Sequence, residues 1–230
     1  MRRFLFVFAF AAISATDADA QRRGTYTSAE SAIWVGGGIA GFTGQGVNDG
    51  KSGSTWDFGN STSWQYRASL EKTIQNQSSF GVVGTYVRVP FIYRSSTSTI
   101  PGASGGARCT RCDANLNMMT LAGTFHIGGG TGFHQVIDLS AGVAAYRELK
   151  RDDDGSALAP SSGNIDPIFS AGYGFGYGLS QTTQINLVQD YSIALHEKTG
   201  LANGVSNTNT VRALRVSVRY GFGRHSPRRR

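Results

Sequence analysis

Strand-like segments follow residue 30, and the connections between them are alternately long and short. Each segment is about 10–14 residues long and alternates apolar with polar side chains. The long connections are polar, and the short ones are rich in Gly, Ser and Gln. A transmembrane barrel has this layout, because its outer loops are long and its periplasmic turns are tight. We therefore predict an all-β fold, a transmembrane antiparallel up-and-down β-barrel of about eight strands over residues 31–222.

The predicted strands have the lengths expected of tilted membrane spans. The first connection, up to Gly59, is rich in Gly, Asn, Ser and Asp and is expected to be a loop. The longest polar connection, Arg94–Asp113, joins the third strand to the fourth. The predicted strands are Ser31–Thr43, Ser61–Thr73, Phe80–Tyr93, Asn115–Ile127, Phe133–Leu149, Ile165–Leu179, Gln184–Leu195 and Thr210–Phe222.

The first 20 residues have the three parts of a secretory signal peptide. Arg2 and Arg3 give a positive start, an almost wholly apolar run extends from Phe4 to Ala15, and a small-x-small cleavage site precedes Gln21. The alternative, a membrane anchor, needs a longer apolar helix, since hydrocarbon is about 30 Å thick. We predict cleavage after residue 20, a periplasmic lead-in over 21–30, and location in the cell outer membrane.

Composition alone would suggest a soluble protein, since the mean hydropathy is −0.21 and the chain has 31 glycines. Alternating lipid-facing and lumen-facing residues hide a barrel from hydropathy, however. A soluble β-sandwich shows the same alternation with its apolar face inward, and is the alternative fold. The net charge is +7. Part of it lies in a basic tail, 223–230, whose arginines either contact anionic headgroups or cell wall or are simply solvated; no nucleic acid partner is expected.

The strand faces are clearest in the last segment. Leu214, Val216 and Val218 alternate there with Arg215, Ser217 and Arg219. We predict that the apolar set faces lipid and the polar set faces the lumen. Aromatic residues near predicted strand ends are candidates for interfacial girdles: Trp64, Phe91, Tyr93, Tyr177, Tyr220 and Phe222.

The closing run Val211–Phe222 alternates and ends in an aromatic residue. With the export signal and the loop pattern, it resembles the small outer-membrane barrels of the OmpA, OmpX and opacity-protein type over Ile33–Phe222. It departs from them in having Gly223–Arg230 after the aromatic residue. The resemblance implies architecture more than activity. It implies outer-membrane lipid and lipopolysaccharide, the barrel-assembly machinery, and surface ligands bound through the loops as partners.

Charged residues of both signs are predicted to face the lumen. An eight-stranded barrel is just wide enough for side chains to fill its interior. A buried charge must be paired or hydrated, so we expect either a polar plug or a charged constriction of a narrow pore. Asp190 and Arg215, on adjacent strands, are the expected pair. Inward glycines of Ile165–Leu179 favour open space unless large side chains such as Tyr86 and Arg88 fill it. The predicted network is Arg67, Glu71, Arg88, Asp138, Asp190, Arg215 and Arg219.

The two cysteines, Cys109 and Cys112, lie in the longest polar connection. A disulfide-closed turn is the preferred interpretation for an exported loop, and free thiols are the alternative. A metal site would require more ligands. His126 and His134 flank a Gly-rich turn and could contribute two ligands to a metal, but a site generally needs three or four. We expect no metal and no cofactor.

A lipid-modifying hydrolase is the least favoured function. Its nucleophile, base and orienting acid would have to converge near the outer leaflet, and Ser192, His196 and Glu197 form the best candidate cluster. The Asp152-Asp153-Asp154-Gly155 run lacks the alternating ligands of a calcium loop and is expected to be a solvated acidic loop. We expect a non-enzymatic protein with a role in envelope integrity, or in surface interaction or adhesion through its extracellular loops. A narrow porin-like channel for small solutes is the alternative.

Overall fold

The computed structural model describes residues 31–50, 52–59, 62–75, 77–95, 109–160, 163–196 and 207–223. The predicted signal peptide, the lead-in and residues 224–230 lie outside these ranges. Within the described ranges no helix is long and apolar enough to span a membrane. The strands are β1 (Ile33–Gly44), β2 (Val47–Asp49), β3 (Ser54–Asp57), β4 (Ser63–Gln75), β5 (Ser78–Ser95), β6 (Arg111–Ile127), β7 (Gly132–Arg151), β8 (Asn164–Gly178), β9 (Thr183–Leu195) and β10 (Thr208–Phe222).

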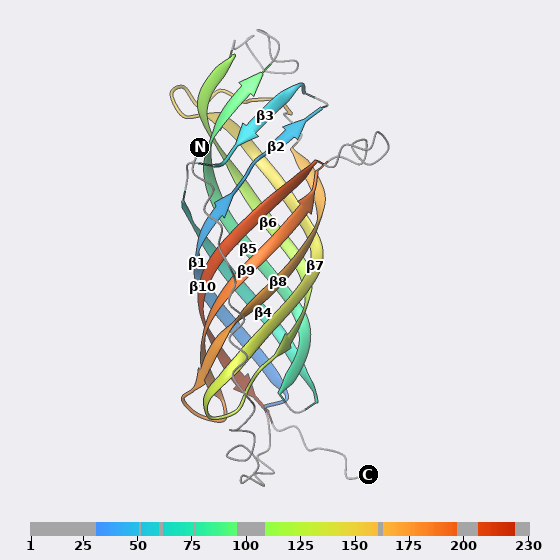
Figure 1. Cartoon of the computed structure of the whole chain (residues 1–230), viewed down its shortest axis with the longest axis vertical. Helices are drawn as coiled ribbons and strands as arrows, with labels where there is room; N and C mark the ends of the chain where they lie inside the picture. The colour runs from blue at the N-terminus through green and yellow to red at the C-terminus, as the bar shows by residue number, and fades with distance from the viewer. Residues whose placement is uncertain are drawn as a thin grey trace, which may run out of the picture.

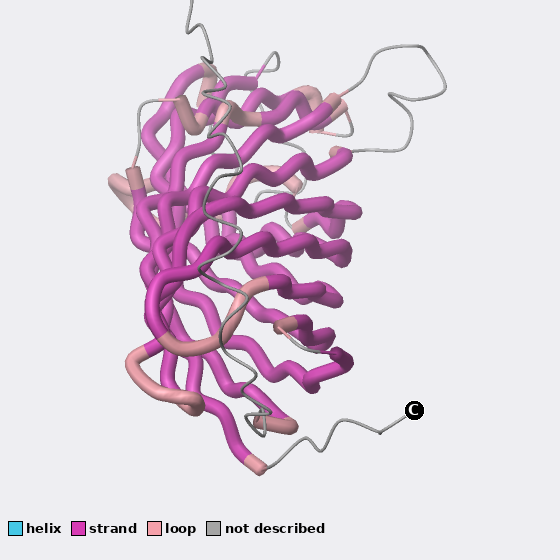
Figure 2. The backbone as a smooth tube through the Cα atoms, turned by 60° about the horizontal axis from the view of Figure 1, so that its bottom comes forward, coloured by secondary structure: helices cyan, strands magenta, loops and turns pink. Residues whose placement is uncertain are grey.

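Eight of the strands close into an antiparallel barrel (Figures 1 and 2). Their order around the barrel is β4, β1, β10, β9, β8, β7, β6 and β5, and β5 pairs with both β4 and β6. The first and last strands join in register, with Ile33 opposite Phe222. Closure leaves no open edge among these eight strands, which is what a hydrocarbon environment requires. The predicted fold class is confirmed.

Short turns and long connections lie at opposite ends of the barrel (Figure 1). The turns between β4 and β5, β6 and β7, and β8 and β9 lie at the end where Ile33 and Phe222 pair. By the usual barrel layout this is the periplasmic end, and the opposite end is extracellular. β5, β6 and β7 have 18, 17 and 20 residues, whereas β1, β4 and β9 have 12 or 13. The longer strands therefore build one side of the extracellular mouth higher than the other.

The first connection contains a hairpin where the sequence predicted a loop. β2 pairs with β3, and β3 pairs with the extracellular end of β5, so that Trp56 lies opposite Tyr93. The Trp56 side chain is fully buried and Phe58 is nearly so. The indole Nε1 of Trp56 donates to Ser54 Oγ at 3.0 Å. The hairpin therefore brings two aromatic side chains into the mouth of the barrel.

The barrel interior has an apolar extracellular part and a charged periplasmic part. The buried apolar cluster includes Trp56, Phe58, Leu116, Met118 and Tyr146. This arrangement corrects one sequence expectation about aromatic residues. Phe91 and Tyr93, predicted as girdle residues, are 5% and 0% exposed and face inward. The other four predicted girdle residues do face outward: Trp64, Tyr177, Tyr220 and Phe222.

Candidate functional site

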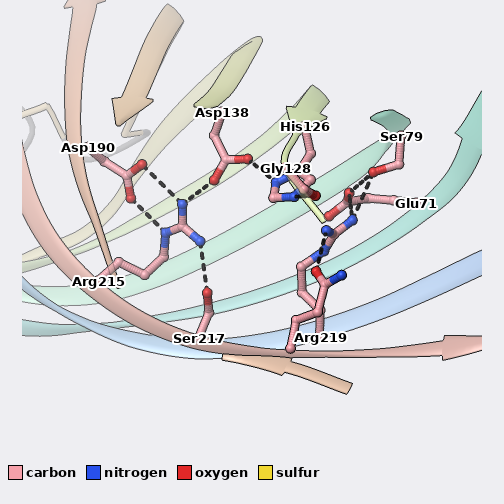
Figure 3. Close-up of polar contacts among 10 residues, drawn as sticks. Glu71, Ser79, His126, Gly128, Asp138, Asp190, Arg215, Ser217 and Arg219 are labelled. Carbon is pink, nitrogen blue, oxygen red and sulfur yellow. Dashed lines mark hydrogen bonds and ion pairs between the residues drawn. The ribbon is translucent and has the colours of Figure 1, made fainter. Parts of the chain in front are cut away.

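Arg215 is the centre of the charged part of the lumen (Figure 3). It extends from β10, and its Nε lies 2.8 Å from Asp190 Oδ2 on the neighbouring β9. Its Nη2 contacts Asp138 on β7, which is not adjacent to β10 in the barrel. Its Nη1 donates to Ser217 Oγ at 3.0 Å. One guanidinium thus joins three strands across the interior, with only 4% of its side chain exposed.

Arg219 forms a second ion pair closer to the periplasmic end. Its Nη2 lies 2.6 Å from Glu71 Oε2 on β4 and donates to Ser79 Oγ at 2.8 Å. Ser79 in turn donates to Glu71 at 2.6 Å. The guanidinium carbon is 4.9 Å from the centroid of the Trp34 ring, a cation–π distance. Ser79 thus hydrogen-bonds both partners of the pair, which helps to offset the cost of burying the two charges.

His126 connects the network to the periplasmic turn between β6 and β7. Its Nδ1 lies 2.6 Å from Asp138 Oδ1, and its Nε2 lies 2.9 Å from the Gly128 carbonyl oxygen (Figure 3). His134 Nδ1 lies 3.1 Å from the Gly132 carbonyl oxygen. Both histidines are thus engaged by turn backbone. Among the described residues no group of three or more His, Cys, Asp or Glu could hold a metal ion.

The structure places most of the predicted network inside the barrel and one member outside. Arg88 faces outward and donates from Nη2 to Asn115 Oδ1 at 3.0 Å, so its predicted lumen position is wrong, and Tyr86 also faces outward. Asp190 and Arg215 are diagonal rather than directly opposite, because Asp190 pairs in register with Ala213. The other members line one or both of two small lumen cavities: Arg67, Glu71, Asp138, Asp190, Arg215 and Arg219.

The two lumen cavities are small. Their volumes are about 10 and 40 Å³, enough for a few water molecules at most. The inward glycines of β8 do not create a channel. A Cβ on Gly172 would lie 2.3 Å from Asp190 Oδ1, and one on Gly176 would lie 2.3 Å from His134 Nε2. These glycines make room for side chains of the neighbouring strands.

The predicted hydrolase cluster is not assembled in the described part of the chain. His196 is 1% exposed and makes an edge-type ring contact with Trp56, with 5.2 Å between ring centroids. Its Nδ1 is 2.6 Å from Asp166 Oδ2, whereas Ser192 instead bonds Ser170 at 2.7 Å inside the lumen. Glu197 lies outside the described residues. The histidine is therefore part of the buried mouth and not of a surface facing the outer leaflet.

The cysteines are joined by a disulfide at the extracellular start of β6. Cys109 is buried in the apolar cluster, and Cys112 pairs in register with Tyr93 on β5. In the acidic loop, Arg151 contacts Asp153, and its Nη1 lies 3.6 Å from Asp154. These carboxylates pair with the arginine that ends β7.

The barrel exterior is apolar, in contrast to the charged lumen. On β10, Leu214, Val216 and Val218 are 47–54% exposed, whereas the alternating Arg215 and Arg219 are 3% and 5% exposed. A continuous apolar exterior around a closed sheet is stable in hydrocarbon and not in water. This chain is a small membrane-spanning β-barrel. The same distribution excludes the β-sandwich alternative, in which the apolar face would be buried.

No family model and no curated protein matches the sequence of this barrel. Solved outer-membrane proteins share its architecture at low identity. Neisserial surface protein A is 12% identical, with 83% of this chain and 97% of that chain covered and a TM-score of 0.48. OprG from Pseudomonas aeruginosa is 14% identical, with coverages of 84% and 97% and a TM-score of 0.45. The protease OmpT from Escherichia coli is 7% identical, with coverages of 83% and 97% and a TM-score of 0.43. None of these likenesses assigns a role to this barrel.

Proposed function

We propose that this barrel is a closed, non-enzymatic protein that acts through its extracellular face, in surface interaction or envelope integrity. The observation that supports this proposal is a lumen closed at two levels. The ion pairs of Arg215 and Arg219 cross the periplasmic part, and the side chains of the β2–β3 hairpin fill the mouth. An ion would have to disrupt both layers to pass through.

Each layer is costly to open for a different physical reason. Opening the lower layer separates buried ion pairs, and breaking a buried pair costs about 3–5 kcal/mol. Opening the upper layer removes Trp56 and Phe58 from an apolar cluster in which both are at most 2% exposed. Re-exposing a large aromatic side chain costs on the order of 2–3 kcal/mol. A steady conducting state would have to bear both costs.

The same closure gives the extracellular end a fixed base for its connections. The tall β5–β7 side carries the disulfide at its upper end. The β2–β3 hairpin adds two short strands beside β5 (Figure 1). Binding residues on loops are effective when a rigid scaffold positions them. The architecture therefore suits a protein whose ligands are met outside the cell.

Conductance across planar bilayers tests the proposal. The refolded barrel should give no steady openings, with insertion verified by heat-modifiable mobility of the same preparation in lipid vesicles. Regular openings of the wild-type chain would support the narrow channel and refute the closed barrel. A strain lacking the protein should in addition show weaker attachment to surfaces or greater sensitivity to bulky antibiotics, and complementation should restore the defect. Absence of both defects would contradict an extracellular role.

A further inference from the structure

A further cavity lies outside the lumen. It is an open groove of about 500 Å³ between β6, β7 and the connection that follows β7. We call it the rim groove and define it by Asn117, Met119, Arg147, Glu148, Lys150 and Leu158. No sequence pattern pointed to it, because a fold irregularity creates it.

That irregularity is a β-bulge in β7. The register of β6 and β7 shifts between Asn115 and Asn117, and Glu148 has a φ of +53°. As a result, the consecutive residues Arg147 and Glu148 are both exposed, which a regular strand does not allow. The connection then folds back, with Leu158 N donating to Leu149 O at 2.8 Å, and forms one wall of the groove.

The rim groove lies where the exterior changes from apolar to charged. Arg88, Asn117 and Arg147 pair in register across three adjacent strands and form one polar row. On the periplasmic side of this row, Met119 and Leu121 are 45% and 63% exposed and belong to the lipid-facing belt. The groove therefore opens at the level where outer-leaflet headgroups meet acyl chains.

The charges in the rim groove are mainly positive. Arg147 and Lys150 provide two cations, and Glu148 is the carboxylate beside them, with its Oε2 3.9 Å from Lys150 Nζ. Asn117 Nδ2 donates a hydrogen bond to the same carboxylate oxygen, Glu148 Oε2, at 3.0 Å. Arg88, one strand away, adds a further cation to the row, and Asp152 adds a second carboxylate, which accepts from Asn115 Nδ2; cations remain in excess by three to two. A phosphate placed here meets donors from two strands, and charge-assisted bonds of this kind are the stronger class of hydrogen bond.

We propose that the rim groove binds the phosphate of an outer-leaflet glycolipid whose acyl chains lie along the apolar belt. An anionic amphiphile matches both the charge and the apolar surface of the site. The cations lie on the extracellular side of the groove, and apolar side chains lie on its periplasmic side. A soluble anion would gain nothing from Met119. The proposal does not depend on a closed lumen, so the conductance test and the lipid test fail independently.

Equilibrium binding of fluorescent lipid A to the folded barrel in detergent micelles tests this proposal. Lipid A with both phosphates should bind about tenfold more tightly than the same lipid A without phosphates. The double substitution Arg147→Gln with Lys150→Gln should weaken binding of the phosphorylated form roughly fivefold to tenfold. The matched control, Arg94→Gln with Arg111→Gln, removes two cations that lie on the same side of the barrel outside the groove, and should leave affinity nearly unchanged.

A gain of affinity gives an outcome that misfolding cannot produce. Glu148→Gln removes the carboxylate from the groove and should tighten binding of phosphorylated lipid A about twofold to threefold. Heat-modifiable mobility verifies that each variant is folded. Equal affinity for both forms of lipid A, equal losses in groove and control variants, or weaker binding by Glu148→Gln would each overturn the proposal. Competition by inorganic phosphate at equal concentration would show a site for free phosphate and would overturn the lipid assignment.

Discussion

Replacing Arg215 by Met tests the lumen network most directly. Methionine keeps much of the side-chain volume and removes the charge. The substitution leaves Asp138 with His126 as a partner at 2.6 Å, but it removes the ion pair of Asp190 with Arg215. The carboxylates of Asp138 and Asp190 are only 8% and 14% exposed, so water replaces the lost guanidinium poorly.

The expected loss follows from the geometry of the pair. Charge centres about 4 Å apart attract by about 4 kcal/mol at an effective dielectric constant near 20. Leaving buried carboxylates without their cation should therefore cost Arg215→Met about 3–5 kcal/mol of unfolding free energy. Asp190→Asn should cost less, about 1–3 kcal/mol, because Arg215 keeps its contacts with Asp138 and Ser217. The order of the two losses is as informative as their size.

Urea unfolding in lipid vesicles, followed by the folded band on unheated gels, gives these free energies. The control is Leu214→Met, an outward change on the same strand, which should alter stability by less than about 1 kcal/mol. A loss below about 1 kcal/mol for Arg215→Met would refute a buried network and indicate hydrated charges. A loss for Asp190→Asn equal to that for Arg215→Met would refute the role of Asp138 as a second partner.

Three further predictions concern the exterior, the mouth and the disulfide. Val216→Arg should lose about 2–4 kcal/mol in vesicle unfolding and Thr43→Arg, nearer the extracellular rim, only about 0–1 kcal/mol; equal losses would contradict the membrane position. Trp56→Ala should cost about 3–5 kcal/mol yet produce no conductance, because the lower ion pairs remain, and openings in this variant would show that the mouth alone closes the lumen. Cys109→Ser with Cys112→Ser should lose no more than about 2 kcal/mol and should keep heat-modifiable mobility, because the closed loop is short; failure to fold would contradict this.

The strands and their faces were predictable where lumen and lipid differ in polarity. The predicted strand Thr210–Phe222 is observed as Thr208–Phe222, with Val216 outward and Arg215 inward as expected. In this strand the alternation of apolar and polar residues shows which side chains face lipid and which face the lumen, because the lower lumen is charged and the exterior is apolar. Period-two patterning also located Phe80–Tyr93, observed as Ser78–Ser95.

The faces of β5 could not be assigned in the same way, because its upper part has apolar residues on both sides. Val87 and Val89 face the apolar upper lumen, so Arg88 between them must face outward. A rule that places charges inward gives the wrong answer here. The inward positions of Phe91 and Tyr93 follow from the same cause.

The contacts across the lumen join residues that are far apart in the sequence, so no local sequence pattern predicts them. Arg215 and Asp138 are 77 residues apart, and Arg219 and Glu71 are 148 apart. The pair of Arg215 with Asp190 was predictable because β9 adjoins β10. The contact of Arg215 with Asp138 was not, because the Arg215 guanidinium reaches across the interior to make it. Polar side chains from opposite walls of a narrow barrel contact one another only where no layer of water separates them. The ion-pair network across the lumen is therefore a property of the assembled barrel and not of any single segment.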